Sequence, residues 1–124
     1  MISYLIQFLI AFIILEHFYF LYLEMIAWET AGKKAFKGVL KDELFKPTKG
    51  LAANQGLYNG FLACGLLWSF FIKDVEWSNN IRTFFLTCIS IAGIFGGITA
   101  SKKIFFIQAL PALISLIILV LFKS

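Results

Sequence analysis

The sequence predicts an all-α fold, an integral membrane four-helix bundle with up-down topology. Of its 124 residues, 60% are hydrophobic and only 15% are charged, which is far more apolar than a soluble domain of this length requires. Four apolar segments follow one another, and each approaches or exceeds the roughly 20 residues that cross a hydrocarbon core. We therefore expect one membrane domain over residues 1–124, without a separate soluble domain.

The expected spans are, in order along the chain, residues 2–28, 51–72, 81–100 and 104–122. No basic residue precedes the first, which is too long for the core of a signal peptide, so we expect a retained helix. The last span contains Pro111, which can bend it where neighbouring groups take up the freed backbone.

Basic residues predict the orientation. Eight of the 11 Lys and Arg residues fall in the loop 31–50 and the turn 101–103, whereas Lys73, Arg82 and Lys123 fall on the other side. Because cytoplasmic loops carry the excess of Lys and Arg, we expect the loop 31–50 to be cytoplasmic. Both termini then lie outside, and the protein resides in the inner (cytoplasmic) membrane of the cell.

The loop itself has two readings. Phe36, Val39, Leu40 and Leu44 fall on one helical face, as in an interfacial helix that rests on anionic headgroups. Gly38 weakens such a helix, and a solvated basic loop is the alternative. The net charge of +4 does not indicate nucleic acid, because the lysines lie in short loops beside spans and no nucleic-acid-binding motif accompanies them.

Ionisable residues mark the first span as the candidate site. Glu16, His17 and Glu24 lie inside it, and an ionisable group at the centre of a membrane helix costs roughly 2.5–3.5 kcal/mol on insertion scales. At about 100° per residue, His17, Glu24 and Trp28 point in nearly the same direction. Two hydroxyl groups in the same stretch belong to Tyr19 and Tyr22. We expect this polar stripe to have partners or a purpose.

The second span carries polar residues in two pairs at helical spacing: Asn54 with Tyr58, and Gln55 with Asn59. Since consecutive spans are antiparallel, Asn54 and Gln55 should lie near the depth of Glu24. Asn59 should lie closer to the depth of Glu16 and His17. Glycine and alanine in this span permit close helix packing, so we expect a hydrogen-bonded network between the first two helices.

The segments EHFYFLYLEMIAWET and LAANQGLYNGFLACGLLW, with a short basic loop between them, resemble the small four-helix membrane proteins of domain-of-unknown-function family 1304. The resemblance implies a fold more than an activity. It also implies a set of signature positions, namely Glu16, His17, Tyr19, Tyr22, Glu24, Trp28, Asn54, Gln55, Tyr58 and Asn59.

Three functions stay open. The first is binding of a lipophilic or amphipathic small molecule between the first two helices, in an apolar pocket with a few convergent polar groups. Its expected ligand-binding residues are Tyr19, Tyr22, Glu24, Trp28, Asn54, Gln55, Tyr58 and Asn59. The second is a membrane enzyme or proton-coupled carrier with Glu16, His17 and Glu24 as candidate catalytic residues. The third is a structural or interaction protein whose polar stripe fixes helix packing.

We expect no cofactor and no metal. Cys64 and Cys88 lie on different spans, without the paired spacing of a zinc or redox site, and His17 is the only histidine. A carboxylate and histidine metal site shared across an oligomer stays open. The expected partners are membrane lipids, a lipophilic small molecule and a second copy of the chain, packed through Gly93 and Gly97.

Overall fold

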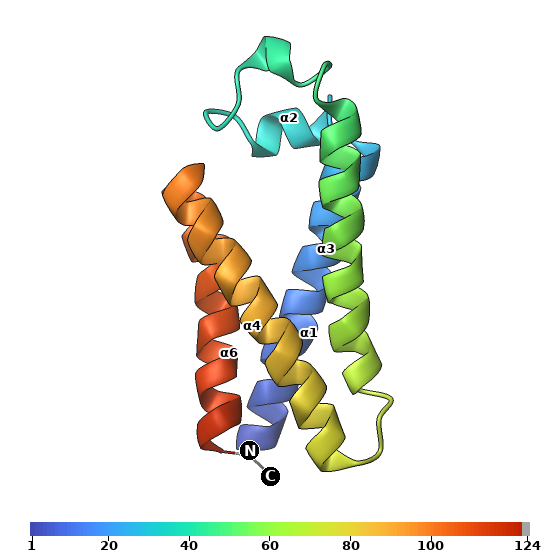
Figure 1. Ribbon diagram of the computed structural model, residues 1–124, viewed down its shortest axis with the longest axis vertical. Coiled ribbons are helices and arrows are strands. Elements are labelled where there is room, and N and C mark those ends of the chain that lie inside the picture. The colour runs from blue at the N-terminus through green and yellow to red at the C-terminus, as the bar shows by residue number, and fades with distance from the viewer. Residues whose placement is uncertain (123–124) are drawn as a thin grey trace. The chain divides into compact units, whose positions relative to one another are not determined.

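The computed structural model describes residues 1–122, in which helices are joined by turns and loops and there is no β-strand (Figure 1). The long helices are α1 (Ile2–Leu21), α3 (Lys49–Ser69), α4 (Val75–Thr99) and α6 (Leu110–Leu121). Short helical elements are α2 (Ala31–Ala35), α5 (Lys102–Ile104) and the 3-10 turn η2 (Asp42–Leu44). Two π-helical segments are η1 (Tyr22–Ile26), which continues α1, and η3 (Phe105–Ala109), which joins α5 to α6. The prediction of an all-α fold is confirmed.

The helix count differs from the prediction, because α2 forms within the expected loop 31–50 in addition to the four long helical segments. Within residues 1–122, three helical stretches are long and apolar enough to cross a membrane: Ile2–Ile26, Val75–Thr99 and Lys102–Leu121. Helix α3 is long enough but is not among them. Polar residues make α3 less apolar than the three other long helical stretches, although it has the length of a membrane span.

Within the described residues, contacts divide the chain into two compact units. The central unit is residues 15–63, which include the end of α1, η1, α2, η2 and most of α3. The terminal unit is residues 1–14 together with residues from Cys64 onward, which include α4 to α6. The candidate residues of the first two predicted spans all fall in the central unit.

In the terminal unit, α4 packs closely against the η3 segment. A Cβ on Gly93 would lie 2.5 Å from the backbone nitrogen of Ala109, and one on Gly97 would lie 2.7 Å from the Cβ of Phe105. Only a hydrogen fits at such distances. Gly93 and Gly97 are therefore used in packing within the chain, and a homo-oligomer through them stays a prediction.

Pro111 lies at the start of α6, directly after the π-helical segment η3. Proline has no backbone N–H and its ring crowds the preceding turn. A local π turn is one of the adjustments by which a membrane helix accommodates such a residue. The sequence predicted that Pro111 can bend the helix, and the departure from α-helical geometry lies in the π turn before it.

In the central unit, η1 and the end of α1 run antiparallel to α3 (Figure 1). Small residues allow the close approach: a Cβ on Gly60 would lie 2.6 Å from Leu21 Cδ1, and one on Gly56 would lie 2.6 Å from Met25 Cγ. These glycines set the level at which the two helices meet.

Residues 31–48 do not form the single interfacial helix that one reading of the sequence predicted. Helix α2 ends at Ala35, and Gly38 has a φ of +87°, in the left-handed region that interrupts a right-handed helix. The partly buried Phe36 and Leu40 pack against a core of Trp28, Phe45 and Ala52. Burial of these apolar side chains in the protein therefore takes the place of a continuous amphipathic face.

Candidate functional site

Glu24 lies in the π-helical turn at the end of the first apolar helix. The backbone N–H of Ala27 donates to the carbonyl of Tyr22 at 3.0 Å, five residues back, as a π turn requires. Such turns are rare in proteins, and those that occur are often found at functional sites. Glu24 is buried there, with 8% of its surface exposed, so its carboxyl group needs a hydrogen-bonding partner.

Asn59 of α3 supplies that partner. Its side-chain Nδ2 donates to Glu24 Oε1 at 2.5 Å, and Asn59 is itself buried. The contact joins residues 35 positions apart in the sequence, and a hydrogen bond to a carboxylate is among the stronger ones in proteins. It is the polar link between α1–η1 and α3 that the two signature segments build.

The amide that reaches Glu24 is Asn59, which was expected closer to the depth of Glu16 and His17. Asn54 and Gln55, which were expected near the depth of Glu24, lie within two residues of Gly56, but their side chains are exposed. The reason is the seating of Gly56 against η1, where its Cβ would lie 3.0 Å from Glu24 Cβ. Asn59 follows Gly56 by three residues and so lies on the same face of α3.

One oxygen of the Glu24 carboxyl group stays available. Oε1 accepts from Asn59, whereas Oε2 has no hydrogen bond from any of residues 1–122. Oε2 is also accessible from the surface, because Glu16 Oε1 is the one side-chain polar atom of the described residues that is buried and lacks a hydrogen bond. The Glu24–Asn59 pair, as we call these two residues below, therefore offers an acceptor at the protein surface.

Glu16 and His17 form a second polar group on α1. His17 is fully buried, and its Nδ1 lies 3.9 Å from Glu16 Oε1. The ring of His17 also contacts Phe20 edge-on, at 5.2 Å between ring centroids. Within residues 1–122, Glu16 Oε1 is a buried polar atom without a hydrogen bond. A buried unsatisfied oxygen is costly.

The remaining predicted ligand residues lie on the surface of the central unit. Tyr19 and Tyr22 are exposed and stack on each other, with ring centroids 6.2 Å apart. Tyr58 is exposed and contacts Phe61, at 6.1 Å between centroids. Asn54 and Gln55 are also exposed. These side chains do not enter the buried network, so they present aromatic and amide groups to the surroundings of the helices.

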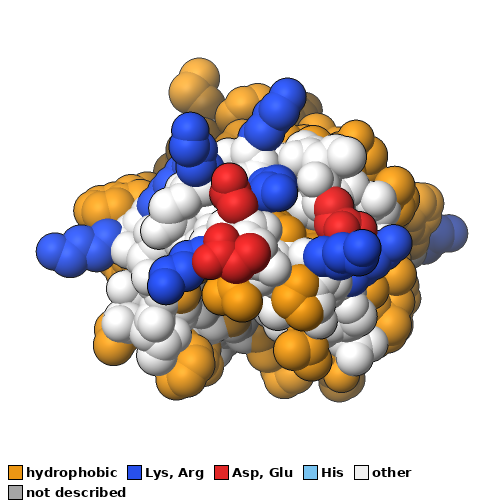
Figure 2. Space-filling view, turned by 90° about the horizontal axis from the view of Figure 1, so that it is seen from above, with side chains coloured by type: hydrophobic (Ala, Val, Ile, Leu, Met, Phe, Trp, Pro, Cys, Tyr) orange, Lys and Arg blue, Asp and Glu red, His pale blue; other side chains and the backbone are white. Residues whose placement is uncertain are grey.

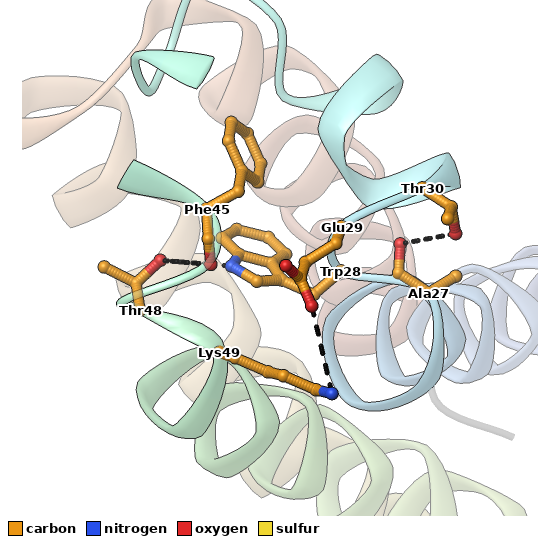
Figure 3. Close-up of polar contacts among 7 residues, drawn as sticks. All are labelled: Ala27, Trp28, Glu29, Thr30, Phe45, Thr48 and Lys49. Carbon is orange, nitrogen blue, oxygen red and sulfur yellow. Dashed lines mark hydrogen bonds and ion pairs between the residues drawn. The ribbon is translucent and has the colours of Figure 1, made fainter. Parts of the chain in front are cut away.

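Trp28 is buried in a small core that fastens the segment after the first helix. Its indole Nε1 donates to Thr48 Oγ1 at 3.1 Å, and its ring lies 4.8 Å from that of Phe45 (Figure 3). Thr48 Oγ1 in turn donates to the Leu44 carbonyl at 2.6 Å. Beside this core, Lys49 Nζ lies 3.9 Å from Glu29 Oε2 (Figure 3). Trp28 thus supports the start of α3 directly.

Sequence reasoning assigned no role to Arg82 beyond its charge. In the terminal unit its Nε donates to Ser69 Oγ at 2.9 Å, and its guanidinium lies 4.6 Å from the centre of the Phe70 ring. Ser78 Oγ donates to the Ser69 carbonyl at 2.7 Å. These contacts join the end of α3 to the start of α4. The available signal was that Arg82 is the single arginine of the chain.

Cys64 and Cys88 are free thiols. In the part of the chain that the structure describes, no group of three or more His, Cys, Asp or Glu side chains is arranged to hold a metal ion.

Comparison with known proteins gives two findings. A family model described as "Protein of unknown function (DUF1304)" matches residues 11–120, which include every candidate residue of the central unit. The uncharacterized protein YpaA of Lactococcus lactis subsp. lactis (strain IL1403) is 32% identical over 104 residues, which cover 83% of this chain and 86% of YpaA. No solved structure matches the chain.

Proposed function

The chain belongs to the DUF1304 family, and from this premise we propose that it is a multi-pass membrane protein that binds an amphipathic small molecule at the Glu24–Asn59 pair. The resemblance drawn from the signature segments is thereby confirmed, and the binding function is our own step. It goes beyond the family, whose description assigns no activity.

The observation that carries the proposal is the half-satisfied carboxyl group of Glu24. Its Oε1 is held by Asn59 at 2.5 Å, and its Oε2 is left without a partner among residues 1–122. A fixed acceptor at the end of an apolar helix suits a ligand whose polar end is a hydroxyl or amine donor. The exposed rings of Tyr19, Tyr22 and Tyr58 suit contact with its apolar part.

The membrane arrangement that we propose has four spans, with α3 as the span that packs against α1 and η1. The polar groups of α3 that lower its hydropathy include Asn59, which is satisfied by Glu24 inside the protein. With the lysine-rich segment 31–50 in the cytoplasm, both termini lie outside the cytoplasmic membrane.

Native mass spectrometry tests the binding function. The protein is purified from its own membranes in mild detergent, and the bound mass is compared between wild type and Glu24→Gln. We expect a reproducible bound molecule that is lost in Glu24→Gln. It is kept in Glu76→Gln, which makes the same chemical change at an exposed position of α4. Retention in both variants, or a protein that carries only exchangeable bulk lipid, contradicts binding at the Glu24–Asn59 pair and favours a structural role for the pair.

A second candidate, a proton-coupled carrier or membrane enzyme, is favoured by one further observation. Glu16 Oε1 is buried without a hydrogen bond and lies 3.9 Å from His17 Nδ1. A carboxyl group and an imidazole at this separation can exchange a proton after a small movement or through one water. In vesicles that enclose a pH-sensitive dye, the carrier requires proton entry that Glu16→Gln abolishes. Equal entry rates for wild type and Glu16→Gln rule out the carrier.

A further inference from the structure

The central unit has a surface cleft of about 620 Å³. The residues that line it follow, in the sequence, the apolar stretch that ends at Ile26. Its polar lining consists of Glu29, Thr30, Lys33, Lys34, Lys37 and Asp42. None of these residues belongs to the Glu24–Asn59 pair. For a helix that crosses the bilayer up to Ile26, the next residues lie at the level of the lipid headgroups.

The charges of the cleft are unbalanced. Of its two carboxylates, Glu29 is already paired, since its Oε2 lies 3.9 Å from Lys49 Nζ outside the cleft. The side chains of the three lysines have no hydrogen bond or ion pair with any of residues 1–122. The lining therefore includes three lysines and one carboxylate without an ion pair, and the cleft has room and donors for an anion. Figure 2 shows basic side chains that project outward beside acidic ones on the face seen from above.

The backbone that carries Lys33 and Lys34 is held in place by the packing of the preceding residue, Gly32. The backbone N–H of Gly32 donates to the Ala27 carbonyl at 2.7 Å. A Cβ on Gly32 would lie 2.8 Å from the Leu23 carbonyl oxygen and 3.2 Å from the Trp28 ring. Gly32 is therefore pressed against the end of the first helix, and Lys33 and Lys34 follow it directly. The positive charges are attached to a buried, closely packed support.

We propose that this cleft binds the phosphate-bearing headgroup of an anionic membrane lipid. The ammonium groups of Lys33, Lys34 and Lys37 contact the phosphate. The acyl chains lie along the apolar stretch that ends at Ile26. Basic pockets beside membrane helices recognise anionic headgroups in this way. The site is separate from the Glu24–Asn59 pair. The pair offers an acceptor and selects a ligand with a donor group, whereas the cleft offers donors and selects an anion.

The test uses the full chain in detergent and two short-chain lipids with identical acyl chains, phosphatidylglycerol and phosphatidylcholine. We expect wild type to bind the anionic lipid at least about tenfold more tightly, because each lysine near an anionic headgroup adds attraction. The triple variant Lys33→Gln, Lys34→Gln, Lys37→Gln removes this preference. A matched triple variant, Lys46→Gln, Lys73→Gln, Lys103→Gln, has the same net charge but changes exposed lysines outside the cleft, and it keeps the preference.

Three outcomes overturn the proposal. Wild type with no preference between the two lipids has no anionic headgroup site. An equal loss in both triple variants assigns the preference to overall charge. Displacement of the lipid by inorganic phosphate at an equal concentration assigns the cleft to a free anion. If the cleft triple variant melts below wild type, the double variant Lys34→Gln, Lys37→Gln, at two exposed positions, replaces it. Glu24→Gln keeps the lipid preference, so this test is separate from that of the proposed function.

Discussion

Asn59 of α3 donates a hydrogen bond of 2.5 Å to Glu24 in the π-helical turn that ends the first apolar helix, and both side chains are buried. This contact connects the two segments that carry the family resemblance. It joins a carboxyl group at the end of the first apolar helix to an amide of α3. The contribution of this hydrogen bond to the free energy of unfolding can be measured without any ligand.

Removal of Asn59 is expected to destabilise the protein. Asn59→Ala leaves Glu24 Oε1 buried without a donor, and hydrogen bonds between membrane helices are worth about 0.6–2 kcal/mol. We expect a loss of that size in the free energy of unfolding in detergent. In Asn59→Ala combined with Glu24→Gln, the two effects should be less than additive. Additive effects, or an unchanged melting temperature in Asn59→Ala, would show that the contact does not operate in the folded protein.

Close backbone packing predicts a contrast between two glycines. Gly93→Ala inserts a Cβ 2.5 Å from the backbone nitrogen of Ala109, which overpacks the α4–η3 contact and costs about 1–3 kcal/mol. Gly50, at the start of α3, has no atom within 4 Å of its ideal Cβ. Gly50→Ala is therefore expected to be neutral or stabilising by up to about 1 kcal/mol. Thermal melts of both variants test this, and equal shifts would contradict the packing of α4.

Trp28 is expected to hold the segment 31–48 in place. Trp28→Ala removes the indole from its contacts with Phe45 and Thr48 and, as for other buried aromatic residues, costs about 3–5 kcal/mol. Trypsin should then cut at the lysines of this segment much faster than in wild type. Trp77→Ala, at an exposed tryptophan of α4, is the control and should leave the cleavage rate unchanged. Equal protection in Trp28→Ala would remove its supporting role.

Membrane topology distinguishes four spans from three. If α3 crosses the bilayer, both termini lie on one side and the segment 31–50 lies on the other. Single cysteines introduced at Ser3, Lys41 and Ser124, after Cys64 and Cys88 are changed to Ala, report the side by labelling with a membrane-impermeant thiol reagent. We expect labelling of intact cells at Ser3 and Ser124 but not at Lys41. Labelling at only one terminus would mean that α3 does not cross.

The amino-acid sequence was sufficient for the all-helical fold and for the apolar helices of span length. Apolar runs of span length arise from local composition, so the helical segments could be predicted close to where they occur. Helical periodicity likewise grouped His17, Glu24 and Trp28 on one face, and all three side chains are buried. Local signals explain these predictions, because period and composition do not depend on distant residues.

The partner of Glu24 was decided only by the tertiary structure. The π turn over Tyr22–Ile26 changes the rotation of the helix at Glu24. The close contacts of Gly56 with Met25 and of Gly60 with Leu21 fix which face of α3 meets the first helix. Asn59 lies on that face, so it reaches the carboxyl group, whereas Asn54 and Gln55 do not.

The same holds for the cleft, whose lysines are neighbours in the sequence but follow Gly32, which is packed against the Leu23 carbonyl and the Trp28 ring. Composition and periodicity determine which residues are helical and which face is polar. Which faces of two helices meet depends on close contacts between residues far apart in the chain, and only the folded structure contains that information.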